Sequence, residues 1–397
     1  MDEQNHATCY GLADPSAYFD QKNDEGNVAV ALKRSRDRQA KNIAERKEKT
    51  YKAIAASNLI GRSRGWLREN DPDAPKDEHG HGYWTLERIN ELRHKAGTFQ
   101  GRPEGAEPIV LALSKLKGGV GNTTTCVHLA HYLALQGLRV LAIDFDAQAS
   151  LTSILGGMNP DIHLDEDDII VHPLQHEPGA FHEVIRETYF HNVFLAPANG
   201  LLRNLEVELT LQAFGYKPSP KDENGNEIGA YERLSHGLKE YKDYFDVILI
   251  DCPPNLNLIT GNALNAADGM INVLRPSGPD SASHAMYMGS LANYYSYEGK
   301  PLRYFRLLIS QYQDNGACNE EDLLLRQLHG PYVLHNKIAV NAEISRAMGN
   351  LHSVYSLEKP LSTREAHNNG KKTMDKALGE ILGDIRAIWE METEEDG

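Results

Sequence analysis

The sequence has few of the features that mark membrane, secreted or disulfide-stabilised proteins. Its longest apolar runs, such as 110–113 and 247–250, fall far short of the ~20 residues that cross a bilayer. The N-terminus lacks the basic-then-apolar pattern of a signal peptide. The four cysteines form no CxxC pair, which argues against a disulfide framework or a zinc knuckle. We therefore predict a soluble, cytoplasmic protein without a membrane partner, with reduced thiols at Cys9, Cys126, Cys252 and Cys318.

The charge of the chain is unevenly distributed. Its 397 residues, 41% of them hydrophobic and 24% charged, are typical of a globular protein of two or three domains. A net charge of −15 argues against a surface that binds nucleic acid throughout. Val28 to Arg68, however, holds 12 Lys or Arg against 3 Asp or Glu. This basic segment indicates either a DNA-binding face or a solvated helix with ion pairs four residues apart.

The N-terminal quarter of the chain is expected to be helical. Residues 1–27 are polar and aperiodic, as in a partly ordered arm. A helix is predicted over 33–50, followed by two short helices over 51–60 and 63–69. Gly61 separates the short helices, which is the spacing of a helix-turn-helix motif.

A domain over 28–97 would contain these helices. After a Pro/Asp/Gly loop, 83–85 is predicted as a short wing strand, and Thr85 then caps a helix with apolar residues at helical spacing. The segment resembles a MerR-like winged helix-turn-helix. The alternative is a small helical cap with surface arginines. In the first interpretation, three arginines on or beside the recognition helix bind DNA: Arg62, Arg64 and Arg68.

A Gly/Pro-containing linker over 98–108 leads into a region with a different sequence pattern. Over 109–340, short apolar runs alternate with helical segments such as 123–136, which predicts an α/β fold with a doubly wound, mostly parallel sheet. Residues 341–397 are expected to form a helical region with an acidic tail. The predicted strands are 109–115, 139–145, 192–198, 246–252, 269–275 and 306–312.

A glycine-rich loop follows the first of these strands. Strand, glycines and helix in this order let successive backbone N–H groups and a helix N-terminus face an anion. Thr123 is placed to give its hydroxyl to Mg²⁺, and Thr124 to bond an inner phosphate. The alternative is a plain turn. The predicted nucleotide-binding residues are Lys117, Gly118, Gly119, Val120, Gly121, Asn122, Thr123 and Thr124.

Three strings carry a family resemblance. LKGGVGNTTT, RVLAIDFDAQASLTSILG and DVILIDCPPNLNLITGNAL resemble the deviant Walker A, switch I and switch II/Walker B segments of ParA-type partition ATPases, in matching order over 109–312. With the preceding winged helix-turn-helix and the closing TMDKALGEI, the chain resembles the larger ParA subgroup, especially RepA proteins of repABC-type plasmids. The resemblance implies a P-loop NTPase fold.

The resemblance also implies roles for single residues. Lys117 matches the signature lysine, which reaches the partner subunit's phosphates in a nucleotide-sandwiched dimer. Asp146 matches the residue that orients the attacking water. Asp144 matches the acid near the metal, and Asp251 the Walker B carboxylate that holds it through a water. Without the rest of the pattern, such acids would be interpreted as caps of the helices that follow their strands.

One departure from the family pattern bears on activity. Where KGGVGKTT has a second lysine, this chain has Asn122, a neutral donor on a shorter stem. Losing that cation is expected to weaken nucleotide binding roughly 10- to 100-fold, and hydrolysis more. Lys115 is nearby but is expected to point away. Ala147 stands where Pro is common, and Ser310-Gln311 where a basic residue is frequent. Whether the chain is an active ATPase stays open at this point.

The implied function is DNA segregation. The resemblance implies ATP/ADP and Mg²⁺ as cofactors, an ATP-dependent homodimer, operator and non-specific DNA binding, autorepression, a ParB-class partner and nucleoid association. Lys371 and Lys372 are further candidates for non-specific DNA contact. The alternative is a catalytically impaired regulator whose nucleotide site is structural or sensory. A MinD-like membrane role is disfavoured by the acidic DIRAIWEMETEEDG, and an iron-protein-like redox role by the cysteine pattern.

Overall fold

The computed structural model describes residues 46–115, 117–298 and 302–395. The predicted arm over 1–27 and most of the helix predicted over 33–50 lie outside these residues, as do Leu116 and the last two residues of the acidic tail. Residues from Lys47 onward form one compact unit. Among the described residues, no helix combines the length and apolar character needed to cross a membrane.

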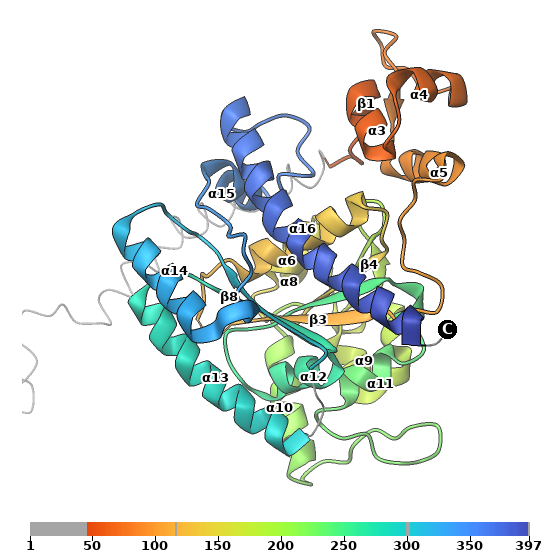
Figure 1. The fold of residues 1–397 in the computed structure, drawn as a ribbon. Helices are drawn as coiled ribbons and strands as arrows, with labels where there is room; N and C mark the ends of the chain where they lie inside the picture. The colour runs from red at the N-terminus through yellow and green to blue at the C-terminus, as the bar shows by residue number, and fades with distance from the viewer. Residues whose placement is uncertain (1–45, 116, 299–301, 396–397) are drawn as a thin grey trace, which may run out of the picture. The chain divides into compact units, whose positions relative to one another are not determined.

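A seven-stranded sheet organises the chain after residue 108 (Figure 1). Its strand order is β5-β6-β4-β7-β3-β8-β9, parallel except for β5, which pairs antiparallel with β6. The six predicted strands are thus confirmed with bounds that differ by at most three residues, and in this sheet only the two-residue edge strand β5 was not predicted. The strands are β3 (Ile109–Ser114), β4 (Val140–Asp144), β5 (Arg186–Glu187), β6 (Val193–Ala196), β7 (Val247–Asp251), β8 (Gly269–Leu274) and β9 (Tyr304–Ile309).

The central strands are buried on both faces because helices cover each side of the sheet. Alternate side chains of β3 point to opposite faces: Leu111 and Leu113 pack in one apolar core, Val110 and Ala112 in another. The first core contains apolar residues of α6 (Asn122–Leu135) and α16 (Arg364–Glu395), and the second contains residues of the five helices from α9 (Val171–His176) to α13 (Gly278–Glu298). This two-sided burial explains the continuous apolar runs in the sequence and confirms the α/β prediction.

The helices of this region come mostly after strands, as crossover connections. The helix predicted over 123–136 is confirmed with a one-residue shift. The α-helices are α6 (Asn122–Leu135), α7 (Ser150–Gly156), α8 (Pro160–His163), α9 (Val171–His176), α10 (Leu202–Ala213), α11 (Arg233–Leu238), α12 (Leu258–Ala266), α13 (Gly278–Glu298), α14 (Gly316–His329), α15 (Ala342–Gly349) and α16 (Arg364–Glu395). Short 3₁₀ helices are η1 (Glu166–Asp168), η2 (Pro178–Val184), η3 (Lys242–Tyr244) and η4 (Gly330–Tyr332).

The segment before residue 98 contains two short helices at a turn. Gly61 ends the first with a left-handed φ of 73°, and the Ser63 hydroxyl accepts from Trp66 N–H to cap the second. Residues 51–52 were expected in the first helix but form a strand, because they pair antiparallel with 83–84. The elements are β1 (Tyr51–Lys52), α3 (Ala53–Ile60), α4 (Arg64–Asn70), β2 (Tyr83–Trp84) and α5 (Leu86–Ala96).

Candidate nucleotide-binding site

The glycine loop joins the end of the central strand β3 to the start of α6. Its backbone needs glycine at two positions, since Gly119 and Gly121 have φ of 78° and 93°. Side chains that follow β9 hold the loop from outside: Ser310 Oγ donates to the Val120 carbonyl, and Gln311 Nε2 to the Gly119 carbonyl at 2.6 Å. The two residues that replace an expected basic residue therefore fix the shape of the loop.

Two acids lie beside the loop at the carboxyl ends of adjacent strands. Asp144 ends β4, Asp251 ends β7, and the two are paired in register. Both are fully buried. Asp144 Oδ2 accepts hydrogen bonds from the backbone N–H and the hydroxyl of Thr152, both at 2.8 Å, so this acid also caps the first turn of α7. Burial, followed by the charge of Asp251, raises the pKa of Asp144 to about 7.

Asn122, at the position of the family's second loop lysine, points into the protein. Its side chain is buried, and its Nδ2 donates to the Leu113 carbonyl at 2.9 Å and to Asp251 Oδ1 at 2.8 Å. An amide nitrogen has two hydrogens, so both donors are engaged. The Asn122 side chain therefore links the loop to the Asp251 carboxylate and has no donor left for another ligand.

The structure corrects the expectation that Lys115 points away. Its side chain is 7% exposed, and its Nζ lies 3.9 Å from Asp146 Oδ2. Burial raises the pKa of Asp251, and the Lys115 charge is the largest influence that lowers it. Lys115 thus provides a positive charge among the acids of the site.

Lys117 lies at the start of the loop and is held by the same chain. Its Nζ contacts Asp280 Oδ1 of α13 at 2.5 Å, and Asp280 Oδ2 also accepts from Arg275 Nε at 2.8 Å. Although burial raises the pKa of Asp280, the hydrogen bonds from Arg275 and Lys117 lower it overall. Sequence reasoning missed Asp280, because this residue lies 163 positions after Lys117 in a helix that carries no motif.

A cavity of about 220 Å³ adjoins the start of α6. Thr124 lines it, and its other walls are formed by residues that follow β9, by α15 with the segment before it, and by Met374 of α16. Sequence reasoning missed these walls because no motif marks them. The cavity is lined by Gly121, Thr124, Thr125, Ser310, Gln311, Ile338, Ala339, Val340, Asn341, Ile344, Ser345, Met348 and Met374.

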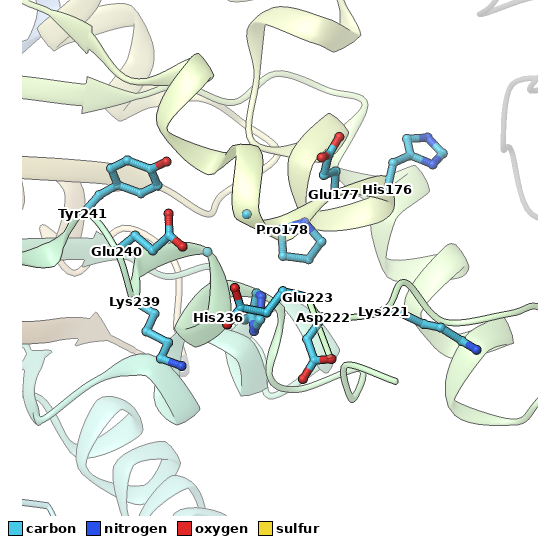
Figure 2. Close-up of a pocket in the computed structure, with 12 residues that line it drawn as sticks. His176, Glu177, Pro178, Lys221, Asp222, Glu223, His236, Lys239, Glu240 and Tyr241 are labelled. Carbon is cyan, nitrogen blue, oxygen red and sulfur yellow. The ribbon is translucent and has the colours of Figure 1, made fainter. Parts of the chain in front are cut away.

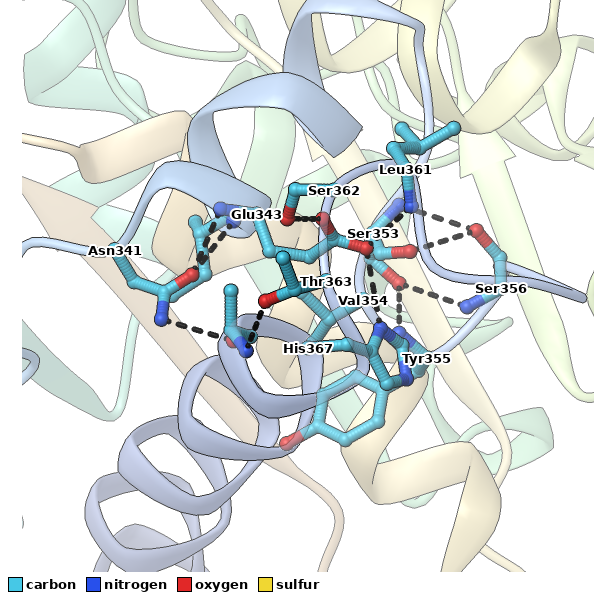
Figure 3. Close-up of polar contacts among 12 residues, drawn as sticks. Asn341, Glu343, Ser353, Val354, Tyr355, Ser356, Leu361, Ser362, Thr363 and His367 are labelled. Carbon is cyan, nitrogen blue, oxygen red and sulfur yellow. Dashed lines mark hydrogen bonds and ion pairs between the residues drawn. The ribbon is translucent and has the colours of Figure 1, made fainter.

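A polar network supports the α15 wall of this cavity (Figure 3). Asn341 caps α15, and the buried Glu343 accepts from Leu361 N–H at 2.7 Å and from the Ser362 hydroxyl. The loop after α15 is also bonded to α6, since His128 Nε2 accepts from Val354 N–H at 3.2 Å. The network fixes α15 and the following loop against the helix that begins at the glycine loop.

The oxygen atoms near the loop fit a magnesium ion. Asp251 Oδ2 is buried and has no hydrogen-bond partner among the described residues, and the Thr123 hydroxyl is close enough to lower the pKa of this acid. Mg²⁺ prefers such oxygen ligands and is usually bound by one or two carboxylates together with substrate phosphates. In the described part of the chain, no cluster of three or more His, Cys, Asp or Glu is arranged to hold a metal by itself.

The predicted DNA-contacting residues lie on the surface. Arg62, Arg64 and Arg68 are exposed at the turn before α4 and on α4, and Arg62 Nη2 donates to the Ala96 carbonyl at 2.5 Å. Lys371 and Lys372 are exposed on α16, where they line a shallow groove with Asn368, Asp375 and Lys376.

A second polar cavity, of about 460 Å³, lies apart from the glycine loop (Figure 2). Acidic and basic side chains alternate around it, and none of the predicted site residues contributes to it. Its walls come from the ends of α9 and α11, from η2 and from the loop around Asp222. This cavity shares no lining residue with the cavity beside Thr124.

Comparisons with known proteins agree with this arrangement. The family described as an AAA domain (AAA_31) matches residues 109–279. A candidate replication protein A of Sinorhizobium fredii is 30% identical over 325 residues, 79% of this chain and 74% of that protein. The chromosome-partitioning ATPase Soj of Treponema pallidum is 38% identical over 152 residues, 38% of this chain and 51% of Soj.

Among solved structures, a candidate plasmid partition protein of Borrelia burgdorferi bound to AMPPNP has the same fold. The TM-score is 0.52 at 20% identity, over 70% of this chain and 99% of that one. The order of the three sequence segments, the parallel sheet and the relative that matches over 79% of this chain all point to one family. The chain belongs to the ParA-like family of partition ATPases.

Proposed function

We propose that this protein is a DNA-partition ATPase that binds ATP with Mg²⁺ at the glycine loop and forms a homodimer when ATP is bound. The observation that carries the proposal is the loop between β3 and α6, with Asp144 and Asp251 at the ends of the neighbouring strands. In this arrangement the loop N–H groups and the start of α6 bind the phosphates, and the cavity beside Thr124 accepts the nucleoside.

Residues Thr123, Asp144 and Asp251 would hold the magnesium ion, which supplies neutralisation of phosphate charge when bound. Asp146 is the residue proposed to orient the attacking water. Its side chain is partly exposed, and its Oδ1 accepts from Gln148 N–H at 3.0 Å, which keeps the carboxylate in a fixed orientation. Gly118 and Val120 complete the phosphate-binding loop.

Dimerisation requires Lys117 to change partner. In the described structure Lys117 pairs with Asp280 of its own chain. To act on the nucleotide of a partner subunit, as the family resemblance implies, it must leave this carboxylate. The Lys117–Asp280 pair therefore belongs to the state before dimer closure.

DNA binding is proposed at two surfaces. The exposed Arg62, Arg64 and Arg68 would contact an operator, and this surface would carry autorepression. Lys371 and Lys372 on α16 would contact DNA without sequence preference. A ParB-class protein would regulate the cycle, and non-specific DNA binding would place the protein on the nucleoid in the cytoplasm.

One observation favours a second function, a nucleotide-sensing regulator with little turnover. Both Asn122 donors are engaged within the protein, so position 122 offers no positive charge to the transition state. ATP turnover of the full chain, measured with and without DNA and a ParB-class partner, separates the two functions. Stimulated turnover supports the partition ATPase, whereas ATP binding and operator binding without turnover support the regulator.

A further inference from the structure

The glycine loop has no positive charge at position 122, where the family pattern has a lysine. Asn122 is neutral, its side chain is buried, and both hydrogens of its Nδ2 bond to protein oxygens. Lys117 is engaged by Asp280. A nucleotide bound in the loop therefore needs another positive charge from its own subunit.

Strand alternation places Lys115 on the side of the sheet that faces α6. Leu111 and Leu113 of β3 pack in the core that contains α6, and Lys115 continues their odd-numbered series just beyond the strand end. Asp251 follows Leu249 in the same way on β7. The ammonium and this carboxylate consequently project from neighbouring strands toward the helix that begins at the glycine loop.

The surroundings of Lys115 are unusual for a lysine. It is the only lysine among the described residues that is buried, and lysine is rarely buried without a firm partner. Its nearest acid, Asp146, is 3.9 Å away, which is an ion pair but too long for a hydrogen bond. Among the described residues, no hydrogen bond engages its Nζ, so three ammonium donors are available to a ligand.

We propose that Lys115 replaces the missing loop lysine, binding a phosphate oxygen of the nucleotide held by its own subunit. This inference rests on the proposed nucleotide binding. It assigns complementary roles to the two positions: Asn122 takes a structural role against Asp251, and the cation is supplied two residues before the signature lysine. The competing interpretation is that Lys115 only neutralises the buried acids.

The test is an equilibrium titration of the full chain with Mg·ATP and Mg·ADP, following bound nucleotide. Wild type is compared with Lys115→Met, Asn122→Lys and the double variant. Lys217→Met, at an exposed lysine remote from the loop, is the matched control. Loss of one charge-assisted contact predicts a Kd about 10- to 100-fold higher for Lys115→Met. The double variant is expected to recover most of that loss, because Asn122→Lys returns a cation to the loop.

The outcomes are distinct. A Lys115→Met protein that binds ATP within twofold of wild type overturns the inference, as does a loss that Asn122→Lys does not reverse. Thermal unfolding of every variant shows whether the fold is kept. If Lys115→Met does not fold, Lys115→Arg is used instead, and this variant is expected to retain ATP binding because it keeps the positive charge. If Lys115→Arg loses as much ATP affinity as the neutral Lys115→Gln variant, the proposed phosphate contact of Lys115 is also refuted. A wild-type chain that binds no nucleotide refutes the proposed function itself.

Discussion

Replacing Asn122 by alanine separates the structural role of this residue from a role in nucleotide binding. The substitution removes the donors to the Leu113 carbonyl and to Asp251 Oδ1, both of which are fully buried. A buried hydrogen bond contributes about 0.5–1.5 kcal/mol, and one to a charged group about 1.5–3 kcal/mol. We expect Asn122→Ala to lower the free energy of unfolding by about 2–4 kcal/mol.

The same substitution should leave the Kd for ATP within twofold, because neither donor faces the phosphates. Urea unfolding followed by circular dichroism measures the first effect, and nucleotide titration the second. Thr125→Ala is the matched control, since it removes a single hydrogen bond, from Oγ1 to the Gly121 carbonyl, in the same helix. A stable Asn122→Ala protein with ATP affinity reduced tenfold or more would show that the amide serves the phosphates instead.

Further substitutions test DNA binding, dimerisation and the pH dependence of stability. Removing Arg62, Arg64 and Arg68 together should abolish operator binding in a gel-shift assay without changing the unfolding transition, and wild-type affinity should fall steeply with salt; unaltered binding would exclude this surface. Asp280→Asn should free Lys117 and lower the ATP concentration needed for dimerisation, measured by light scattering; a higher requirement would contradict the pairing described. His128, with its pKa lowered by burial to about 4, stays neutral when folded but protonates near pH 6.5 when unfolded, so stability should decrease as pH falls from 6.5 to 4. His128→Gln should flatten this dependence, whereas substitution of the exposed His79 should not.

Much of the fold was predictable because burial on both faces produces an unbroken apolar run. The strand Val247–Asp251 is an example, since each of its residues is buried. Residues 51–52 were expected in a helix because their strand partners, 83–84, lie 31 to 33 positions away and leave no local signal. The two-residue strand β5 is too short to show a period.

The residues of the candidate site were predictable where they belong to one continuous sequence motif. They were less predictable where the fold brings together residues from distant strands and helices. The glycines and the acids of the three strings were found from local pattern. The inward direction of Lys115 was missed, because it depends on the alternation of β3 continuing past its last hydrogen-bonded residue. Asp280 and the cavity walls after β9 were missed because only the sheet order brings them to the loop.

Calorimetric titration of the full protein with a non-hydrolysable ATP analogue and Mg²⁺ measures whether this chain binds nucleotide through its glycine loop. We predict saturable binding of one nucleotide per chain, competed by ADP and lost on Gly121→Val. That substitution puts a branched side chain at a φ of 93°, where only glycine is readily accommodated. Absence of binding at millimolar nucleotide, or equal binding by Gly121→Val, would show that the glycine loop is not a nucleotide site.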